Sequence, residues 1–394
     1  MVEDTGERTG SSSRRRFLSI GGAAAVAGLA GCSGGSGESG SGDGEGGGGG
    51  GGGSGDSMLS DSFDPEEPDW EENNYLSSLL IDEGYERGSR ADLESMGDRD
   101  VDEVPHGEPV REAPEDESEW LEPETLVFTE SPSEDVQGRY EEDFEAVFER
   151  IEEETGLPVE YNRVDNYAAS VEAMRSERAH IANFSTGTTA FAVNLCGAVP
   201  FAAGIDGDAF GYRLFATTRA DADDIQSVED FANDDVRIAH AEEASNSGHQ
   251  APSALFDQYF DVTADEDYEV NFSGDHSATT RGIAAGDYDA GPICSTCFLD
   301  TVEAESDLSF DDFKVVWASD PFPNGPIAYR YNLHPDIAEG IQAAWLDSDF
   351  EGTAYADRTG YAVFEPIEYR RHWYDIMVIQ EYNGVEYTEG SLSE

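Results

Sequence analysis

The chain has 394 residues, of which 86 are Asp or Glu and only 22 are Lys or Arg, so its formal net charge is −64 at pH 7. Nucleic acids and anionic lipids both require a basic face, and this balance excludes them as partners. It is typical of halophilic archaeal proteins, because at molar salt the Debye length falls to about 3 Å and self-repulsion is screened.

The N-terminus carries an export signal. Residues 13–18 read Ser-Arg-Arg-Arg-Phe-Leu, an apolar run covers 20–30, and 29–32 read Leu-Ala-Gly-Cys. This order resembles a twin-arginine signal followed by a lipobox. The apolar run is too short for a membrane span, which needs about 20 residues. We therefore predict that residues 1–31 are a signal peptide and that the lipidated Cys32 anchors the protein on the extracytoplasmic face of the cell membrane.

A tether follows the signal. Residues 33–57 are almost wholly Gly, Ser and acidic residues, which cannot bury enough apolar area to order the chain. Residues 58–119 remain acidic and are interrupted by Pro, and we expect disorder or a loosely docked arm. We therefore assign 32–119 to a flexible tether, and a random coil over 33–119 would reach roughly 50 Å.

From residue 120 the pattern alternates between strands and helices. Hydrophobic spacing predicts strands at 126–128, 159–161, 181–184 and 212–218, with helices over 140–151, 165–174 and from 185 onward. Such alternation predicts a mainly parallel sheet covered by helices on both faces. We assign residues 120–224 to the first part of lobe I.

The pattern restarts after residue 225. Helices are predicted at 228–232, 248–260 and 277–285, and strands at 236–239, 268–272, 289–293 and 313–317. These form lobe II, residues 225–325. A strand at 327–331 and helices at 335–346 and 366–379 return the chain to lobe I, residues 326–394. The predicted fold is therefore α/β, with two lobes joined by two crossing segments in a hinged clamp.

Four collinear stretches identify a family. Residues 129–135 (TESPSED), 166–176 (NYAASVEAMRS), 245–249 (SNSGH) and 321–327 (PFPNGPI) resemble the phosphate, phosphite and phosphonate-binding proteins of ABC importers, over residues 125–374. The resemblance implies a type 2 periplasmic-binding fold, a cleft that closes on one ligand, and delivery to a membrane permease and its ATPase. It also implies a monomeric binding protein with no cofactor.

The physical chemistry of the central stretch agrees with an oxyanion ligand. Ser245, Asn246, Ser247 and Gly248 precede a predicted helix, whose free N–H groups and positive dipole end attract an anion. The alternative is that Ser247 and Gln250 form a capping box of an ordinary helix.

The resemblance assigns further ligand contacts. The aromatic residue before the Glu-Ala helix falls on Tyr167, and the tyrosine before the next strand falls on Tyr212. The histidine that opens a later helix falls on His276, which could equally be a surface cap. Ser185 and Thr186 hold a corresponding place in the first lobe. The implied ligand set is Tyr167, Ser185, Thr186, Tyr212, Ser245, Asn246, Ser247, Gly248, His249 and His276.

Two positions depart from the pattern of relatives that bind aminoalkyl phosphonates. Those relatives carry acids that hold the ligand's ammonium where Cys294 and Gly325 stand here. An ammonium buried without a carboxylate would be left unpaired. Zwitterionic ligands are therefore disfavoured, and phosphate, phosphite and methylphosphonate remain as unranked alternatives.

Cys294 and Cys297 form a C-x-x-C pair. In an exported protein this pair could be a small disulfide, two packed free thiols, a redox pair or half of a metal site. A single pair is weak evidence for zinc.

Other function classes stay open. Ser247, His249 and His276, with Asp275, have the residue types of a phosphoester hydrolase, but the nucleophile elbow Gly-x-Ser-x-Gly is absent from this stretch. A ligand sensor that signals to a membrane kinase would share the same clamp. A metal-delivering clamp built on His240, His249 and His276 is the least favoured, because a hydroxyl-rich motif suits an anion.

Overall fold

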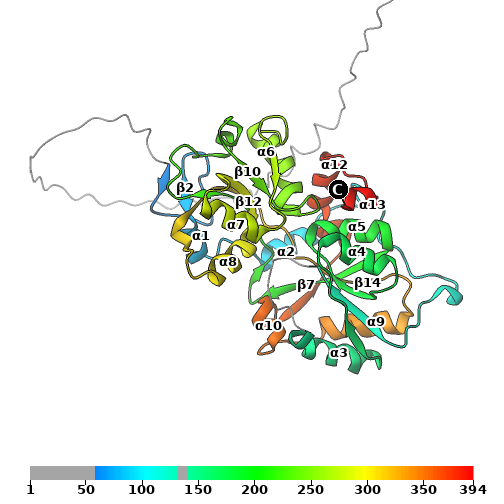
Figure 1. The fold of residues 1–394 in the computed structure, drawn as a ribbon. Coiled ribbons are helices and arrows are strands. Elements are labelled where there is room, and N and C mark those ends of the chain that lie inside the picture. Colours follow the sequence, from blue (N-terminus) through cyan, green and yellow to red (C-terminus); the bar gives the residue numbers. More distant parts are fainter. Residues whose placement is uncertain (1–57, 132–140, 394) are drawn as a thin grey trace, which may run out of the picture. The chain divides into compact units, whose positions relative to one another are not determined.

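The computed structural model describes residues 58–131 and 141–393, which form two mixed β-sheets flanked by helices (Figure 1). The predicted signal peptide, Cys32 and the glycine-rich part of the tether lie outside the described residues. Within the described ranges, no helix is both long and apolar enough to cross a membrane.

Lobe I is built on an eight-stranded sheet with the order β3-β8-β7-β14-β6-β4-β5, in which β15 also pairs with β7. Its strands are β3 (Gly88–Ser89), β4 (Leu126–Glu130), β5 (Val159–Tyr161), β6 (Ile181–Asn183), β7 (Ala198–Asp206), β8 (Ala209–Phe210), β14 (Ile327–Arg330) and β15 (Val363–Pro366). β4 pairs in parallel with β5 and β6, whereas β14 is antiparallel to both β6 and β7.

Lobe II is built on a seven-stranded sheet with the order β1-β2-β13-β9-β12-β10-β11. Its strands are β1 (Leu59–Ser60), β2 (Asn74–Leu76), β9 (Leu214–Arg219), β10 (Ile238–His240), β11 (Val270–Phe272), β12 (Ala290–Cys294) and β13 (Phe313–Ala318). β10 pairs in parallel with β11 and β12, and β9 is antiparallel to β12 and β13.

The helices cover these sheets. They are α1 (Ser77–Asp82), α2 (Arg90–Gly97), α3 (Glu145–Thr155), α4 (Tyr167–Arg175), α5 (Thr186–Cys196), α6 (Ala251–Phe260), α7 (His276–Ala285), α8 (Ser295–Ala304), α9 (Pro335–Leu346), α10 (Ala354–Thr359), α11 (Tyr369–His372), α12 (Tyr374–Tyr382) and α13 (Glu389–Ser393). Short 3-10 turns occur at η3 (Glu117–Glu119), η4 (Glu141–Phe144), η5 (Val228–Ala232) and η7 (Phe310–Asp312), and η6 (Asn246–Gln250) is a π-helical turn. The predicted helix over 366–379 is therefore two helices, α11 and α12.

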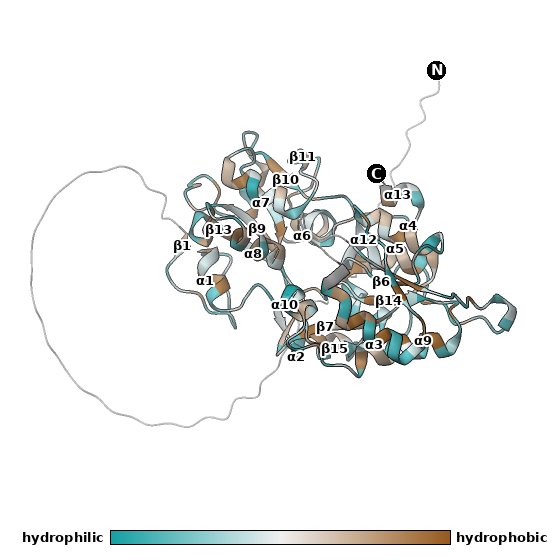
Figure 2. Ribbon diagram, turned by 60° about the horizontal axis from the view of Figure 1, so that its bottom comes forward, coloured by the Kyte–Doolittle hydropathy of each residue, from teal (hydrophilic) through white to brown (hydrophobic). Residues whose placement is uncertain are grey.

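The core of lobe I follows the predicted helical spacing. Val147, Phe148 and Ile151 of α3 are buried against β4 and against Trp345 of α9. Figure 2 shows polar and apolar residues alternating along α3 and α9, as expected for helices with one face on a core. Burial of a large apolar side chain contributes roughly 1.5–3 kcal/mol, so this cluster holds α3 and α9 together on the sheet.

The prediction that the flexible tether extends to residue 119 is wrong for the part of the chain that the structure describes. β2 pairs with β13, and β3 pairs with β8. Tyr75, Leu80 and Tyr85 are almost fully buried among residues of lobe II. The small apolar islands of this acidic segment are therefore packing residues, because they find partners on a sheet far away in the sequence.

The lobe boundaries also differ from the predicted ones. Strand β9 was expected at the end of lobe I, but it pairs with β12 and β13 in lobe II. The two predicted crossings are present, at 211–213 and 319–326. The N-terminal segment adds a third at residues 83–87, between α1 on lobe II and β3 on lobe I. We call residues 83–87 the N-terminal crossing.

Candidate functional site

Two helix N-termini, one from each lobe, meet at the predicted ligand site. α5 of lobe I begins at Thr186, and η6 of lobe II begins at Asn246. A Cβ on Gly187 would lie 2.3 Å from the carbonyl oxygen of Ala244 and 3.0 Å from the amide nitrogen of Asn246. Only glycine permits this approach, so Gly187 brings the positive ends of two helices to one place. This residue was absent from the predicted ligand set, although it follows Ser185 and Thr186 directly.

The central stretch forms a compact N-terminal turn. Ser245 is the N-cap of η6, and its Oγ accepts a hydrogen bond of 3.2 Å from the Gly248 amide. The cap is therefore Ser245, and the alternative capping box between Ser247 and Gln250 is wrong, since Gln250 Nε2 donates to the Glu243 carbonyl instead. Ser245, Ser247 and Gly248 are buried.

His276 holds Ser245 in place. The amide of Cys294 donates to His276 Nδ1 over 3.2 Å, so Nδ1 carries no proton and the neutral ring is protonated at Nε2. Nε2 lies 3.1 Å from Ser245 Oγ and therefore donates to it. Complete burial lowers the pKa of His276 to about 4, so the ring is neutral at pH 7. Because Ser245 Oγ already accepts two hydrogen bonds, its own proton is free to be donated to a ligand.

Tyr212 and Asn246 connect the lobes at the same point. Asn246 Nδ2 donates to the Tyr212 hydroxyl over 3.2 Å, and this hydroxyl also interacts with the Thr186 side chain. Burial raises the pKa of Tyr212, which keeps the phenol protonated. Thr186 Oγ1 donates to the Pro323 carbonyl over 2.8 Å. Asn246 Oδ1 is buried without a hydrogen-bond partner among the described residues, so it can accept from a protonated ligand oxygen.

The other predicted ligand residues differ in position. Ser185 is the N-cap of α5, and its Oγ accepts from the Thr188 amide. Tyr167 is buried at the first position of α4, which is capped by Asn166. His249 points away from the group around His276, because its Nδ1 lies 2.9 Å from Nδ1 of His240.

The histidine arrangement bears on two alternatives. His240 and His249 contact each other, whereas His276 contacts Ser245 and the Cys294 amide, so the three rings form no shared site. Across residues 58–131 and 141–393, no group of three or more His, Cys, Asp or Glu side chains could hold a metal ion. His276 also donates to Ser245, so it cannot act as a general base toward that hydroxyl in this tautomer.

One of the two positions that carry an acid in the aminoalkyl phosphonate-binding relatives has no room for one here. A Cβ on Gly325 would lie 1.9 Å from the Phe184 carbonyl oxygen, so an aspartate cannot replace this glycine without moving the backbone. The structure has no disulfide between Cys294 and Cys297, and the disulfide alternative stays a prediction. The Cys297 amide donates to Cys294 Sγ over 3.4 Å, which makes Cys294 the N-cap of α8. Burial raises the pKa of Cys294, but hydrogen bonds from Cys297 and Thr296 outweigh it and leave the pKa below its ordinary value.

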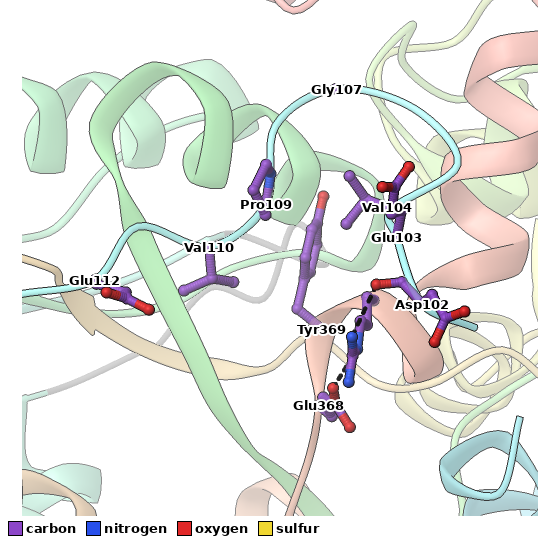
Figure 3. Close-up of a pocket in the computed structure, with 10 residues that line it drawn as sticks. Asp102, Glu103, Val104, Gly107, Pro109, Val110, Glu112, Glu368 and Tyr369 are labelled. Atoms are coloured by element: carbon purple, nitrogen blue, oxygen red, sulfur yellow. Dashed lines mark hydrogen bonds and ion pairs between the residues drawn. The ribbon is translucent and has the colours of Figure 1, made fainter. Parts of the chain in front are cut away.

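A separate cavity of about 740 Å³ lies between residues 102–112 and the start of α11 (Figure 3). Its lining includes four carboxylates and one cation, and Arg370 is already paired with Glu368 and donates to the Asp102 carbonyl. None of the predicted ligand residues lines this cavity. Its negative charge opposes an oxyanion.

The sequence matches one known protein family. Residues 128–373 match the model of the family described as ABC transporter, phosphonate, periplasmic substrate-binding protein. The chain belongs to this family. A curated relative, the phosphate-import protein PhnD of Mycolicibacterium smegmatis, is 28% identical over 232 residues, which cover 56% of this chain and 70% of the relative. The family is one of transport binding proteins that work outside the cytoplasm with an ABC permease and its ATPase.

Solved structures share the fold. PhnD1 from Prochlorococcus marinus, in complex with methylphosphonate, superposes with a TM-score of 0.56 at 16% identity, covering 67% of this chain and 99% of that one. A binding protein component of an ABC phosphonate transporter from Pseudomonas aeruginosa gives a TM-score of 0.53 at 18% identity, covering 62% and 82%. These neighbours are two-lobed periplasmic binding proteins, so the predicted two-lobed α/β fold is confirmed. The sheets are mixed, however, and not mainly parallel as predicted, because β14 and β9 pair antiparallel with both of their neighbours. The family match begins at residue 128, after the N-terminal segment that supplies β1, β2 and β3.

Proposed function

We propose that this protein is the lipid-anchored substrate-binding component of an ABC importer and that it binds a phosphorus oxyanion between α5 and η6. The observation that carries this proposal is the approach of two helix N-termini at Gly187 and Ala244. Oriented N–H groups and neutral hydroxyls solvate an anion without adding a counter-charge. Ser245 supplies a hydroxyl to the same place, and its proton is free because its Oγ already accepts two hydrogen bonds.

Ligand delivery follows from the connection between the lobes. Thr186 of lobe I and Asn246 of lobe II both contact the hydroxyl of Tyr212, which lies on the crossing 211–213, so this shared contact forms only when the lobes are together. A ligand that binds both lobes favours this closed arrangement by its differential affinity for it. The permease can then distinguish the occupied protein from the empty one. Phosphate, phosphite and methylphosphonate suit the site better than an aminoalkyl phosphonate, because Gly325 and Cys294 offer no carboxylate.

The anchoring part of the proposal rests on the sequence. The lipobox at 29–32 would give a mature protein that begins with lipidated Cys32 and is exported by the twin-arginine route. Replacing Cys32→Ser should move the protein from the membrane fraction to the medium. Retention of this variant in the membrane would contradict the lipid anchor.

Binding can be tested by thermal unfolding of the full chain in molar potassium chloride. Phosphate, phosphite, methylphosphonate, 2-aminoethylphosphonate and sulfate are added separately. A ligand at a hundredfold its dissociation constant stabilises the folded state by about 2.7 kcal/mol, or roughly 5–10 °C at this size. A shift with one of the first three supports the proposal, and no shift with any phosphorus oxyanion would overturn it.

A further inference from the structure

The N-terminal crossing runs directly beside the candidate site. Ser295 Oγ donates to the Glu86 carbonyl over 2.5 Å and accepts from the Arg213 amide over 2.8 Å. Ser295 follows Cys294, whose amide donates to His276. The N-terminal crossing, which lies outside the family match, is therefore hydrogen-bonded to Ser295, the neighbour of the residue that holds His276.

Arg87 of this crossing lies against Tyr361 and Gly360 of lobe I. Its guanidinium lies 5.4 Å from the centre of the Tyr361 ring, and the Tyr361 hydroxyl donates to Asn324 Oδ1 over 2.8 Å. Asn324 belongs to the stretch 321–327 that carries the family resemblance. Burial raises the pKa of Tyr361 to about 12, while Arg87 lowers it and Cys294 raises it, so Arg87 and Cys294 both lie near this ring.

One donor of the Arg87 guanidinium is unsatisfied. Its Nη1 is buried without a hydrogen-bond partner among the described residues. Arg213 also has a buried Nε without a partner, but its Nη1 donates to the Ser319 carbonyl, and Arg90 of α2 pairs with Glu365. A buried donor without an acceptor is rare in native proteins and calls for a partner.

Two carboxylates lie near Arg87, and neither forms an ion pair with it among the described residues. Glu86 lies near both Arg87 and Arg213, so two cations share one carboxylate, and burial raises the pKa of Glu86 while both arginines lower it. Asp206 is nearby at Gly360, where a Cβ would lie 3.6 Å from Asp206 Oδ2 and 3.2 Å from Arg87 Nη2, but the two side chains form no ion pair. Arg87 Nη1 therefore remains a buried donor without an acceptor, although carboxylates lie nearby.

We propose that Arg87 is a specificity-determining residue that donates to an anionic oxygen of the ligand. This inference rests on the proposed function and adds the charge that its neutral hydroxyls and histidine lack. Arginine suits this task because its planar fork of donors matches phosphoryl oxygens. The same charge repels a ligand ammonium, so Arg87 selects anionic ligands over zwitterionic ones.

Titration calorimetry of the full chain in molar potassium chloride tests this role. Arg87→Gln, Arg87→Lys and the matched control Arg90→Gln are compared with the wild type, using phosphate, methylphosphonate and 2-aminoethylphosphonate. Arg87→Gln should weaken binding of the preferred anion by about tenfold to a hundredfold, the range for a charged hydrogen bond. Arg87→Lys should lose less, and Arg90→Gln should bind like the wild type.

The ratio between ligands separates a charge effect from a structural one. Arg87→Gln should bring the affinities for methylphosphonate and 2-aminoethylphosphonate closer together. A merely structural loss would weaken the two affinities by the same factor and would contradict the inference. If Arg87→Gln is not folded without ligand, as judged by its thermal transition, Arg87→Lys carries the same comparison with a smaller expected change. Unchanged affinity in the Arg87 variants, with a wild type that binds, would overturn this inference and leave the proposed function intact. A wild type that binds no phosphorus oxyanion would overturn both.

Discussion

Replacing Gly187→Ala should weaken ligand binding without unfolding the protein. The new Cβ would lie 2.3 Å from the Ala244 carbonyl oxygen, and real contacts of this kind are not found below 3.0 Å, so the lobes must separate locally by at least about 0.7 Å. Overpacking of this size costs about 1–3 kcal/mol. Because α5 and residue 244 belong to different lobes, opening of the clamp relieves the clash. The penalty therefore falls on the closed, ligand-bound form.

The expected loss of affinity is about 5-fold to 150-fold, measured by titration calorimetry with the ligand that stabilises the wild type. The ligand-free protein should unfold within a few degrees of the wild type. Gly390→Ala is a matched control, because the nearest atom to its new Cβ is the Thr388 hydroxyl at an ordinary 3.7 Å. Wild-type affinity in Gly187→Ala would refute the idea that this contact belongs to the ligand-bound state.

Three further outcomes are expected. Ser245→Ala should lower both ligand affinity and the unfolding temperature, because the Gly248 amide and His276 lose their acceptor, which costs about 1–2 kcal/mol of folding free energy. Ser247→Ala should lower ligand affinity alone. Equal unfolding temperatures of the two variants would contradict this difference. Burial lowers the pKa of His276 to about 4, so as pH falls the unfolded state takes up the proton before the folded state does. The free energy of unfolding, measured by urea titration, should therefore fall by up to about 3 kcal/mol between about pH 6.5 and 4. If the free energy of unfolding of His276→Asn depended on pH as strongly as that of the wild type, this explanation would be wrong. Leu80→Ala should cost about 2–5 kcal/mol in the same titrations, because this side chain is fully buried; a change below about 0.5 kcal/mol would return residues 58–97 to the role of a tether.

Local periodicity predicted part of lobe I. The spacing of Val147, Phe148 and Ile151 predicted α3, and the apolar run at 126–128 predicted β4, but β7, β8 and β15 were not predicted. These signals are local, because each element's own sequence shows which face is buried. The placement of β9 could not be predicted in the same way. A strand's sequence does not state which sheet it joins, and β9 lies at the switch between the lobes.

The sequence predicted which residues lie at the candidate site, but it did not predict several of the contacts between them. Ser245, Asn246, Tyr212 and His276 do come together, as the family resemblance implied. His249 was predicted to contact the ligand, but its ring contacts His240. The sequence shows that His249 lies in the stretch 245–249, and it does not show which way the ring points. The N-terminal segment was missed because its composition is that of a disordered chain. Its few apolar residues order it only through strand pairing with β13 and β8.

The proposed site would allow a chain with a net charge of −64 to hold an anion. At molar salt the Debye length of about 3 Å screens carboxylates on the surface, so only groups within contact distance of the ligand act on it strongly. Those groups are protonated hydroxyls, helix amides, a histidine kept neutral by burial, and Arg87 at one end. The acidic surface and the anion site therefore obey different electrostatics. Screening separates them, and in dilute salt, where the Debye length grows to about 10 Å at 0.1 M, the surface charge would begin to oppose the ligand.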